Sequence, residues 1–364
     1  MRIKILLFIT LFSFNLNFFA EGKPENKELK QAISETEKEK IENQEYIQHH
    51  ILDSHDFVIS SDKKNNKHLG FHLPVIFYDN GLQIFSSSKF EYGEKVAENN
   101  GNYYTLFHEK IYKTNKEGDL KLDAHGHPTV EKITFDFSIT KNVVMLLFTS
   151  ILMILLFITL ANSYKNNALP KAMVGRMLEP LILFIRDDIA IPNIGEKKYK
   201  KFLGYLLTVF FFILILNVLG LMPFGVNVTG NITITLFLSL LTYLIVQISA
   251  NADYWKHIFW MPGVPVPMKL ILAPIELLGT LTKPFALMIR LFANMSAGHI
   301  VVMSLIALIY YFKNVVAGVA FPVLTFVIYL LEVLVAFLQA YIFTMLSALF
   351  IGMAVQDHDH EDAH

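Results

Sequence analysis

The sequence predicts an all-α polytopic membrane protein with about five transmembrane helices, the last two long and steeply tilted, and a small strand-containing extramembrane domain near the N-terminus. Of the 364 residues, 53% are hydrophobic and 17% are charged, and the mean hydropathy is +0.43. Soluble domains carry about 25% charged residues. Residues 202–252 contain no Asp, Glu, Lys or Arg, and residues 314–356 contain only Glu332. Uncharged runs of this length are typical of membrane spans.

Five hydrophobic segments follow one another along the chain. Residues 143–161, 202–222 and 232–250 each have the length of a single crossing, whereas residues 268–311 and 315–355 are far longer. At ~1.5 Å per residue, helices over the two long segments measure roughly 66 and 61 Å. The hydrocarbon core is only about 30 Å thick. Each long segment therefore either breaks into two crossings or forms one unusually tilted helix.

The N-terminal end is typical of an exported chain. Residues 1–20 place Arg2 and Lys4 before a short apolar run that ends in Ala20, which predicts a cleavable signal peptide. An uncleaved membrane anchor is the alternative. Residues 21–45 hold eight Glu and five Lys, too many charges to bury a core, so we expect a solvated tether there.

A different texture follows in residues 46–140. Short β-prone runs at 73–78 and 82–85 are separated by the turn sequence Asp79-Asn80-Gly81, which predicts strands in a small extramembrane domain. Residues 141–356 then form the membrane domain.

Histidine is abundant in the N-terminal domain and in the acidic tail at 357–364, which is read as solvated. Neutral imidazole is a common metal ligand, but the spacing matches no specific metal site, so surface histidines are favoured over a metal centre. No cofactor is expected. The absence of cysteine excludes disulfides and thiolate sites, and the net charge of −1 argues against a nucleic-acid partner. The domain's histidines are His49, His50, His55, His68, His72, His108, His125 and His127.

Basic residues orient the chain in the bilayer. The loop between the first and second hydrophobic segments is rich in Lys and Arg, which marks it as cytoplasmic. The N-terminal domain is then periplasmic and the C-terminus cytoplasmic, in a multi-pass protein of the cell inner membrane. Within this loop, residues 168–189 interleave apolar and polar side chains, which predicts an interfacial amphipathic helix. The basic residues are Lys165, Lys171, Arg176, Lys197, Lys198, Lys200 and Lys201.

Ionisable residues occur inside both long segments. Glu276, Lys283 and Arg290 are seven apart, so they fall in one stripe of a helix. Asn294 and Ala297 extend this stripe, and on the last helix Glu332 and Gln339 share a face. Ionisable groups at membrane depth are costly and point to function. The bland alternative is a structural ion pair, Arg290 with Glu332, that locks the two helices together.

Proton relay is the chemistry that these side chains suit. Glu276, Glu332 and His299 can each take up and release a proton, whereas Asn294 and Gln339 can orient water or a carboxylate. Arg290 cannot pass a proton because its guanidinium does not deprotonate. It can instead stabilise a carboxylate brought beside it and bar a hydronium from passing.

The sequence Arg290-Leu-Phe-Ala-Asn294-Met-Ser-Ala-Gly298-His299 strongly resembles the signature of subunit a of the F-type ATP synthases. Flanking motifs add to this resemblance, which covers roughly residues 143–355, whereas the N-terminal extension is similar to those of Bacteroidetes-type bacteria. These motifs are Pro274-Ile-Glu276, Lys283-Pro284, Leu-Leu-Glu332, Leu-Gln339-Ala-Tyr341-Ile-Phe343 and Asn217-Val-Leu-Gly-Leu-Met-Pro223.

The resemblance implies the stator of a membrane motor, with two long tilted helices curved around a ring of c subunits. Arg290 then faces the essential carboxylate of the ring. Ala293, Ala297 and Gly298 contact the ring, and Glu276 lies on the cytoplasmic half-channel. The implied partners are the c-ring, the b-type peripheral stalk and the rest of the synthase. The implied outer half-channel is lined by Glu332, His299, Asn294 and Gln339.

Three other classes of protein are weighed against this interpretation. A secondary transporter fits poorly because no internal repeat is present. An intramembrane hydrolase lacks the His-Glu-x-x-His and Gly-x-Ser-x-Gly motifs, and a passive anchor leaves the membrane charges unexplained. No catalytic site and no ATP-binding motif are found, so nucleotide chemistry is assigned to partner subunits, and the coupling ion is left open between H⁺ and Na⁺.

Overall fold

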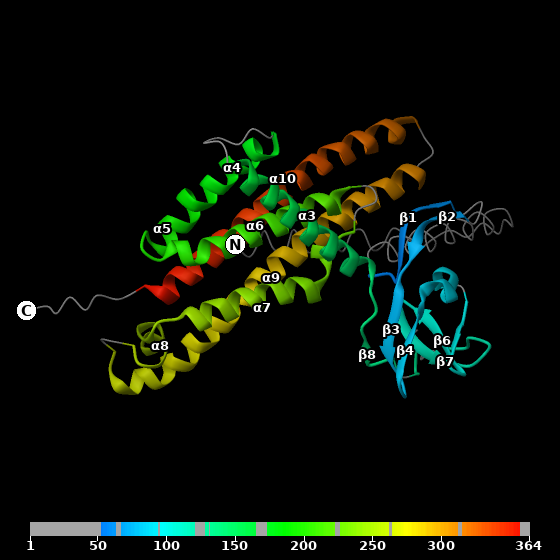
Figure 1. The fold of residues 1–364 in the computed structure, drawn as a ribbon, viewed down its shortest axis with the longest axis horizontal. Helices are drawn as coiled ribbons and strands as arrows, with labels where there is room; N and C mark the ends of the chain where they lie inside the picture. The colour runs from blue at the N-terminus through cyan, green and yellow to red at the C-terminus, as the bar shows by residue number, and fades with distance from the viewer. Residues whose placement is uncertain are drawn as a thin grey trace, which may run out of the picture. The chain divides into compact units, whose positions relative to one another are not determined.

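The computed structural model describes residues 52–356, except 63–66, 94, 121–127, 131, 165–172, 223–225, 262–263 and 312–314. The predicted signal peptide, the charged tether and the acidic tail lie outside the described residues. Figure 1 shows strands in the first part of the described chain and helices in the rest. The predicted fold class is confirmed.

The strand-containing part, here called the β domain, is built from three small antiparallel sheets with the strand orders β1-β2, β4-β3-β8 and β5-β6-β7. Its core is aromatic, with Phe77, Phe90 and Tyr104 fully buried. The predicted strands are confirmed, and β3 pairs with β4 in an antiparallel hairpin around the turn at 79–81. The strands are β1 Asp56–Asp62, β2 Lys67–His72, β3 Pro74–Tyr78, β4 Leu82–Ser86, β5 Ala97–Asn99, β6 Asn102–Phe107, β7 Lys110–Thr114 and β8 Phe135–Asp136, with a 3₁₀ segment η1 at Ser87–Gly93.

Five helices of the following part are long and apolar enough to cross a membrane. The spans are α3 Lys141–Tyr164, α6 Tyr199–Leu221, α7 Ile232–Ser249, α9 Val266–Tyr311 and α10 Val315–Val355. The predicted amphipathic segment is helical where it is described. It forms α4 Met173–Phe184 and the π-helical η2 Ile185–Ala190. The remaining short elements are α5 Ile191–Ile194, the 3₁₀ turn η3 Val228–Gly230 and α8 Ala252–Phe259.

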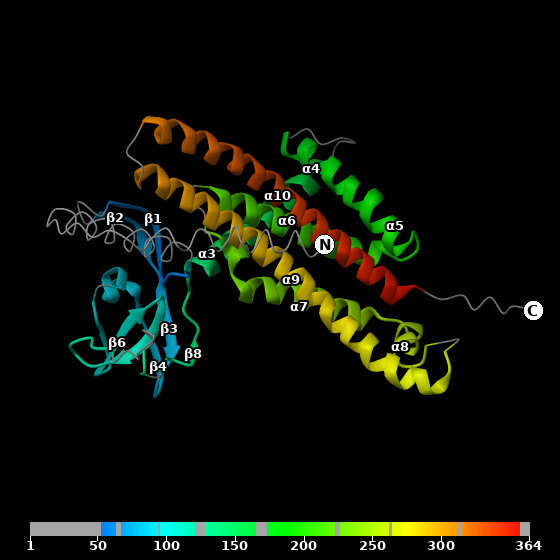
Figure 2. The same ribbon diagram turned by 180° about the vertical axis from the view of Figure 1, so that it is seen from behind.

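Helices α9 and α10 are each continuous, which excludes two crossings per segment. They hold 46 and 41 residues, so at ~1.5 Å per residue they are roughly 69 and 61 Å long. Figures 1 and 2 show them running alongside each other. Helix α8 was not predicted from the sequence. It has only eight residues, in which the apolar side chains alternate with Asp253, Lys256 and His257, so it gives no long apolar run.

The helical core lies where α6 meets α10 and the η2–α5 segment. Phe210, Ile213 and Ile189 are fully buried there, and small residues of α10 such as Ala340 allow close packing. The remaining surfaces of the long helices are apolar and exposed, as expected of faces that meet lipid or partner subunits.

Candidate functional site

Arg290 lies on the exposed face of α9. Ala293, Asn294 and Ala297 are exposed beside it, at the three- and four-residue spacing that places side chains on one helix face. Leu291 and Met295 are buried on the opposite face in the helical core. The side chains beside the guanidinium are small or polar, so this exposed stripe can be approached closely by another surface.

Glu332 of α10 has the opposite environment. Its side chain is only 9% exposed, and its carboxylate packs against the backbone of α9 at Gly298, where a Cβ atom would overlap both carboxylate oxygens. Oε2 is buried and has no hydrogen-bond partner among the described residues. A buried carboxylate oxygen in this state calls for a proton or an ordered water.

A structural ion pair between Arg290 and Glu332 is therefore wrong as an explanation of the two charges. Neither residue has an ion-pair partner in the part of the chain that the structure describes, and one is exposed while the other is buried. A locking ion pair requires both charges to meet and to be desolvated together. The charge of Arg290 and that of Glu332 therefore need separate explanations.

Two of the remaining predicted residues fall on the buried side. Gln339 is 3% exposed and shares the buried face of α10 with Glu332, as the seven-residue spacing predicts. Gly298 is buried against Glu332, where the absence of a side chain makes room for the carboxylate. Its contact with a ring stays a prediction. His299 is half-buried and follows Gly298 directly.

The connection between α6 and α7 holds α9 and α10 in place. Asn217 is fully buried, and its side chain donates to the carbonyl of Ala336 (3.2 Å) and accepts from the hydroxyl of Thr229 (2.8 Å). On the other helix, the Asn227 side chain donates to the carbonyl of Met295 (3.1 Å). These bonds fix both long helices within one or two turns of Glu332 and Arg290.

These hydrogen bonds, here called the bracket, include one more on α9: the Ser296 hydroxyl donates to the carbonyl of Gly230 at 3.2 Å. Sequence reasoning quoted Asn217 only as part of a motif and missed Thr229 and Asn227. The available signal was a cluster of Asn and Thr in an otherwise apolar stretch, where polar side chains need partners.

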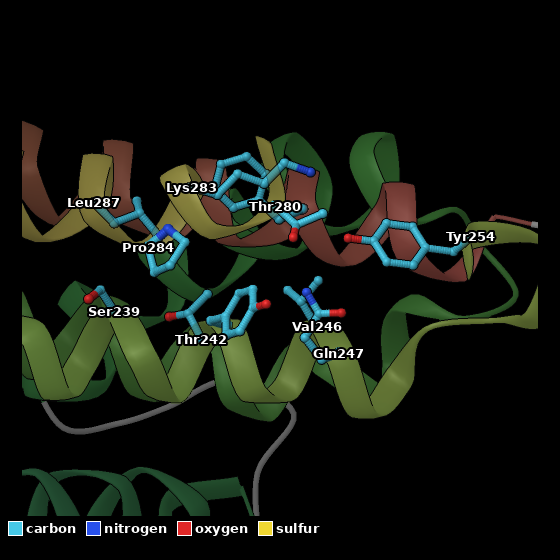
Figure 3. A pocket seen from close by; sticks show the side chains of 11 residues that line it. Ser239, Thr242, Val246, Gln247, Tyr254, Thr280, Lys283, Pro284 and Leu287 are labelled. Carbon is cyan, nitrogen blue, oxygen red and sulfur yellow. The ribbon is translucent and has the colours of Figure 1, made fainter. Parts of the chain in front are cut away.

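A small cavity of about 10 Å³ lies between α7, α8, α9 and α10. Its polar lining includes Thr242, Gln247, Thr280 and Lys283. Figure 3 shows the hydroxyl of Tyr254 turned into this pocket. Of the stripe formed by Glu276, Lys283 and Arg290, Lys283 lines this cavity, whose accessible surface is mostly apolar.

Two buried oxygens at this pocket, Gln247 Oε1 and Tyr254 OH, have no hydrogen-bond partner among the described residues. Glu276 is half-buried and interacts electrostatically with Lys283 and Tyr254, and Lys283 lies over the ring of Phe350 at 5.2 Å. Unpartnered buried oxygens at a cavity are sites for ordered water. Sequence reasoning did not include Gln247 or Tyr254 among the candidate site residues. The available signal was Gln247, a polar side chain within an apolar span.

The histidines of the β domain do not all lie at the surface. His55 is 2% exposed and its Nε2 lies 3.6 Å from Asp136 Oδ2, so the surface interpretation is wrong for this residue. His72 Nδ1 lies 2.8 Å from Asp56 Oδ1. Over the described ranges, no group of three or more His, Asp or Glu side chains is placed to hold a metal ion.

Five helices that are long and apolar enough to cross a membrane, with an arginine on the exposed face of α9 and a carboxylate buried between α9 and α10, define a polytopic membrane protein. The model of the ATP synthase A chain family matches residues 143–352, and a domain of unknown function (DUF8433) matches residues 46–137. The chain therefore belongs to the ATP synthase A chain family.

Relatives extend the similarity. ATP synthase subunit a 2 of Chlorobaculum tepidum is 48% identical over 246 residues, 65% of this chain and 69% of that protein. Subunit a of Chloroherpeton thalassium is 46% identical over 243 residues, 65% of this chain and 72% of that protein. Subunit a 2 of Prosthecochloris aestuarii is 40% identical over 309 residues, 80% of this chain and 94% of that protein.

Proposed function

We propose that protons cross the membrane beside Arg290 along two offset paths, one past Glu332 and one past Glu276. As a member of its family, the chain is the proton-translocating stator subunit of an F-type ATP synthase. The observation that carries the proposal is the contrast between the two side chains, an exposed cation on a small-residue stripe and a buried carboxylate with an unpartnered oxygen.

The exposed stripe of Arg290, Ala293, Asn294 and Ala297 is the surface that meets the c-subunit ring. The guanidinium keeps its charge in any protein environment, so it stabilises the ionised form of a ring carboxylate that comes beside it. The same charge bars a hydronium from moving directly between the two paths. Alanine side chains let the ring approach closely enough for these effects to act at short range.

The outer path delivers the proton. Glu332, with His299 one residue from its Gly298 contact, takes up a proton from the periplasmic side and passes it to the ring carboxylate. Gln339, on the same buried face of α10, orients water along this path. The neutral ring carboxylate then enters the lipid at much lower cost than the ion.

The cytoplasmic path receives the proton after the ring has turned. Glu276 and the pocket at Gln247 and Tyr254 supply the acceptor and the water sites. One proton that falls through 100 mV releases about 2.3 kcal/mol, so several protons are needed for each ATP. The chain has no catalytic site of its own, and nucleotide chemistry belongs to partner subunits, which include the c-ring and a b-type peripheral stalk.

In this arrangement the β domain is periplasmic, the C-terminus is cytoplasmic, and the chain is a multi-pass protein of the inner membrane. The excess of Lys and Arg in the loop between α3 and α6 supports this orientation.

The proposal is tested with Arg290→Ala in inverted membrane vesicles that contain the assembled synthase. ATP-driven acidification falls by at least about tenfold, which corresponds to about 1.4 kcal/mol, because no fixed cation is left to stabilise the ionised ring carboxylate. ATP hydrolysis by the peripheral sector persists. Lys256→Ala, at an exposed cation of α8, is the matched control and pumps normally. Undiminished pumping by assembled Arg290→Ala complexes overturns the proposal.

Glu332→Gln and Glu276→Gln test the two paths separately. Each slows ATP-driven proton transport less completely than Arg290→Ala, because water and neighbouring polar groups remain on the path. If both variants pump at the normal rate while Arg290→Ala does not, the assignment of the two paths is wrong and only the role of the cation survives.

A further inference from the structure

One surface of the β domain is apolar although it faces outward. In sheet β4-β3-β8, burial alternates along β3 and β4, so that Val75 and Phe85 lie in the core while the neighbouring side chains on each strand point away from it. No charged side chain occupies an outward position of β3 or β4. The outward side chains that concern us, here called the apolar face, are Ile76, Tyr78, Leu82, Ile84, Phe135 and Phe137.

The side chains of the apolar face adjoin one another across the strands. Ile76 pairs with Ile84, and Tyr78 pairs with both Leu82 and Phe135. Directly paired residues on one face of a sheet have Cβ atoms about 4.5–5.5 Å apart. Every member of the face except Ile76 is 58–67% exposed. A contiguous exposed apolar patch of this kind marks a site of interaction with a protein or a membrane.

The other three-stranded sheet of the β domain has a different outward surface. Its outward positions carry Glu98, Thr105 and Lys110, each next to a buried residue on its own strand. Charges of both signs and a hydroxyl are typical of a surface that meets water. The lack of charge is therefore a property of sheet β4-β3-β8 and not of the β domain as a whole.

The apolar face is joined to a membrane span without a free linker. The backbone N–H of Phe137 donates to the carbonyl of Ile76 at 2.8 Å. The N–H of Ile139 donates to the carbonyl of Pro74 at 3.1 Å, so bonding to β3 continues until two residues before α3 begins at Lys141. Helix α3 is long and apolar enough to cross a membrane. At no more than ~3.6 Å per residue, Phe137 lies within roughly 14 Å of the start of this helix.

A second attachment leads from β1 and the residues before it. The carboxylate of Asp53 accepts from the hydroxyl of Thr140 at 2.9 Å. Phe57 packs against a buried apolar cluster formed by α3, α6 and η3, and the ring of Phe71 stacks on that of Phe57 with centroids 5.0 Å apart. Because the two attachments leave the β domain from different strands, they hold it at the ends of these helices.

We propose that the apolar face docks on the lipid surface of the membrane at which α3 begins. This inference does not depend on the two proton paths proposed above. Lipid is favoured as the occupant by continuity, since α3 presents exposed apolar side chains such as Leu147 and Phe148 along the span that directly follows Phe137. Such side chains of a membrane span meet lipid.

The composition of the face suits the interface between lipid and water. Apolar side chains of interfacial elements enter about 5–10 Å into the boundary between headgroups and acyl chains. Tyrosine is enriched at this depth because its ring is apolar and its hydroxyl can stay in water, and Tyr78 lies in the middle strand of the face. Since the face carries no charge, its contact with lipid needs no anionic headgroup and persists at high salt.

The test uses the assembled synthase in phosphatidylcholine nanodiscs that each hold one complex and are open to solution on both sides. The chain contains no cysteine, so Ile84→Cys provides one labelling site for a fluorophore on the apolar face, in a synthase whose other subunits have no reactive cysteine. Lys110→Cys, at an exposed position of the other sheet, is the matched control.

Lipid that carries a nitroxide near its headgroup quenches the label at position 84 at least about threefold more than the label at position 110, because only the apolar face enters the headgroup region. Iodide in solution quenches the two labels in the reverse order. The contrast is the same at about 1 M salt, where the Debye length is only ~3 Å.

A charge on the apolar face tests the contact from the other side. Phe137→Asp in the Ile84→Cys chain lowers lipid quenching at position 84 at least about twofold, because a carboxylate resists transfer into lipid. Lys110→Asp in the same chain is the control and leaves the quenching unchanged. If Phe137→Asp does not assemble, the comparison of labels at positions 84 and 110 decides alone, since both are at exposed side chains.

Two results overturn the proposal. Equal quenching of both labels by iodide means that the face is open to water, as it would be if its natural occupant were a second copy of this chain, which a disc with one complex lacks. Weak quenching of position 84 by lipid and by iodide means that another subunit of the synthase covers the face. Stronger quenching of position 84 by lipid supports docking on the membrane.

Discussion

The carboxylate of Glu332 on α10 occupies the space that a side chain at Gly298 of α9 would fill. A Cβ at position 298 would overlap both carboxylate oxygens, so the two helices can place an acid at this depth only because residue 298 is glycine. This contact lies where the Glu332 carboxylate is buried, whereas Arg290 lies on the exposed face of α9. The separation of acid and cation depends on it.

Gly298→Ala is therefore expected to displace the Glu332 carboxylate and to slow proton transport by at least about tenfold, or ~1.4 kcal/mol. Gly279→Ala is the matched control on the same helix, since nothing lies within 4 Å of its added Cβ. Alanine favours a helix by about 1 kcal/mol over glycine, so the control is as stable as wild type or more so. The measurement is ATP-driven acidification in inverted vesicles with equal amounts of assembled synthase. Equal rates for the two alanine variants contradict the steric role of Gly298.

The membrane part of the fold is predictable from the sequence because burial in lipid leaves a simple signal. Long uncharged runs give the five spans, and their bounds agree with the helices to within a few residues. Helical periodicity correctly places Arg290 with Asn294 and Ala297, and Glu332 with Gln339. These relations are local to one helix, and a spacing of three, four or seven residues determines them.

Contacts between helices are not available from spacing. Gly298 was predicted to contact the ring as one of the small residues around Arg290, and only its packing against α10 reveals that the Glu332 carboxylate lies against it. Asn217 bonds to the carbonyl of Ala336 on α10, which is 119 residues away in the sequence. His55 was read as a surface residue, because nothing in its neighbourhood in the sequence indicates that strand β8 brings Asp136 beside it.

The β domain is expected to lose stability in acid through Asp79. This carboxylate accepts from Lys113 (2.8 Å) and from the hydroxyl of Tyr104 (2.9 Å). The hydrogen bond from Lys113 is the main cause that lowers the pKa of Asp79 below its ordinary value, followed by that from Tyr104, while burial opposes them. A lowered carboxyl pKa stabilises the fold at neutral pH, and this contribution is lost as the pH falls through the folded-state value.

Asp79→Asn accordingly destabilises the β domain by about 1 kcal/mol at pH 7. The difference from wild type shrinks as the pH falls below the ordinary aspartate pKa of about 3.9 and vanishes below the lowered folded-state pKa. Amide hydrogen exchange in β3, β6 and β7 of the full chain measures it, after correction for the pH dependence of intrinsic exchange. Glu98→Gln, on an exposed position of β5, is the control with no such dependence. A deficit that persists unchanged in acid contradicts the assigned role of the ionised carboxylate.

Asn217 is expected to control the position of α10, since its side chain bonds to Ala336 one turn beyond Glu332. Asn217→Leu leaves the buried hydroxyl of Thr229 without its acceptor and costs about 1–2 kcal/mol. The thermal stability of the solubilised chain falls, and proton transport falls with it because Glu332 is no longer held against Gly298. Thr229→Val removes only one of the two hydrogen bonds and has a smaller effect.

Thr208→Val is the control, because its exposed hydroxyl bonds only within its own helix. If this variant lowers the melting temperature as much as Asn217→Leu does, the hydrogen bonds of Asn217 do not position α10.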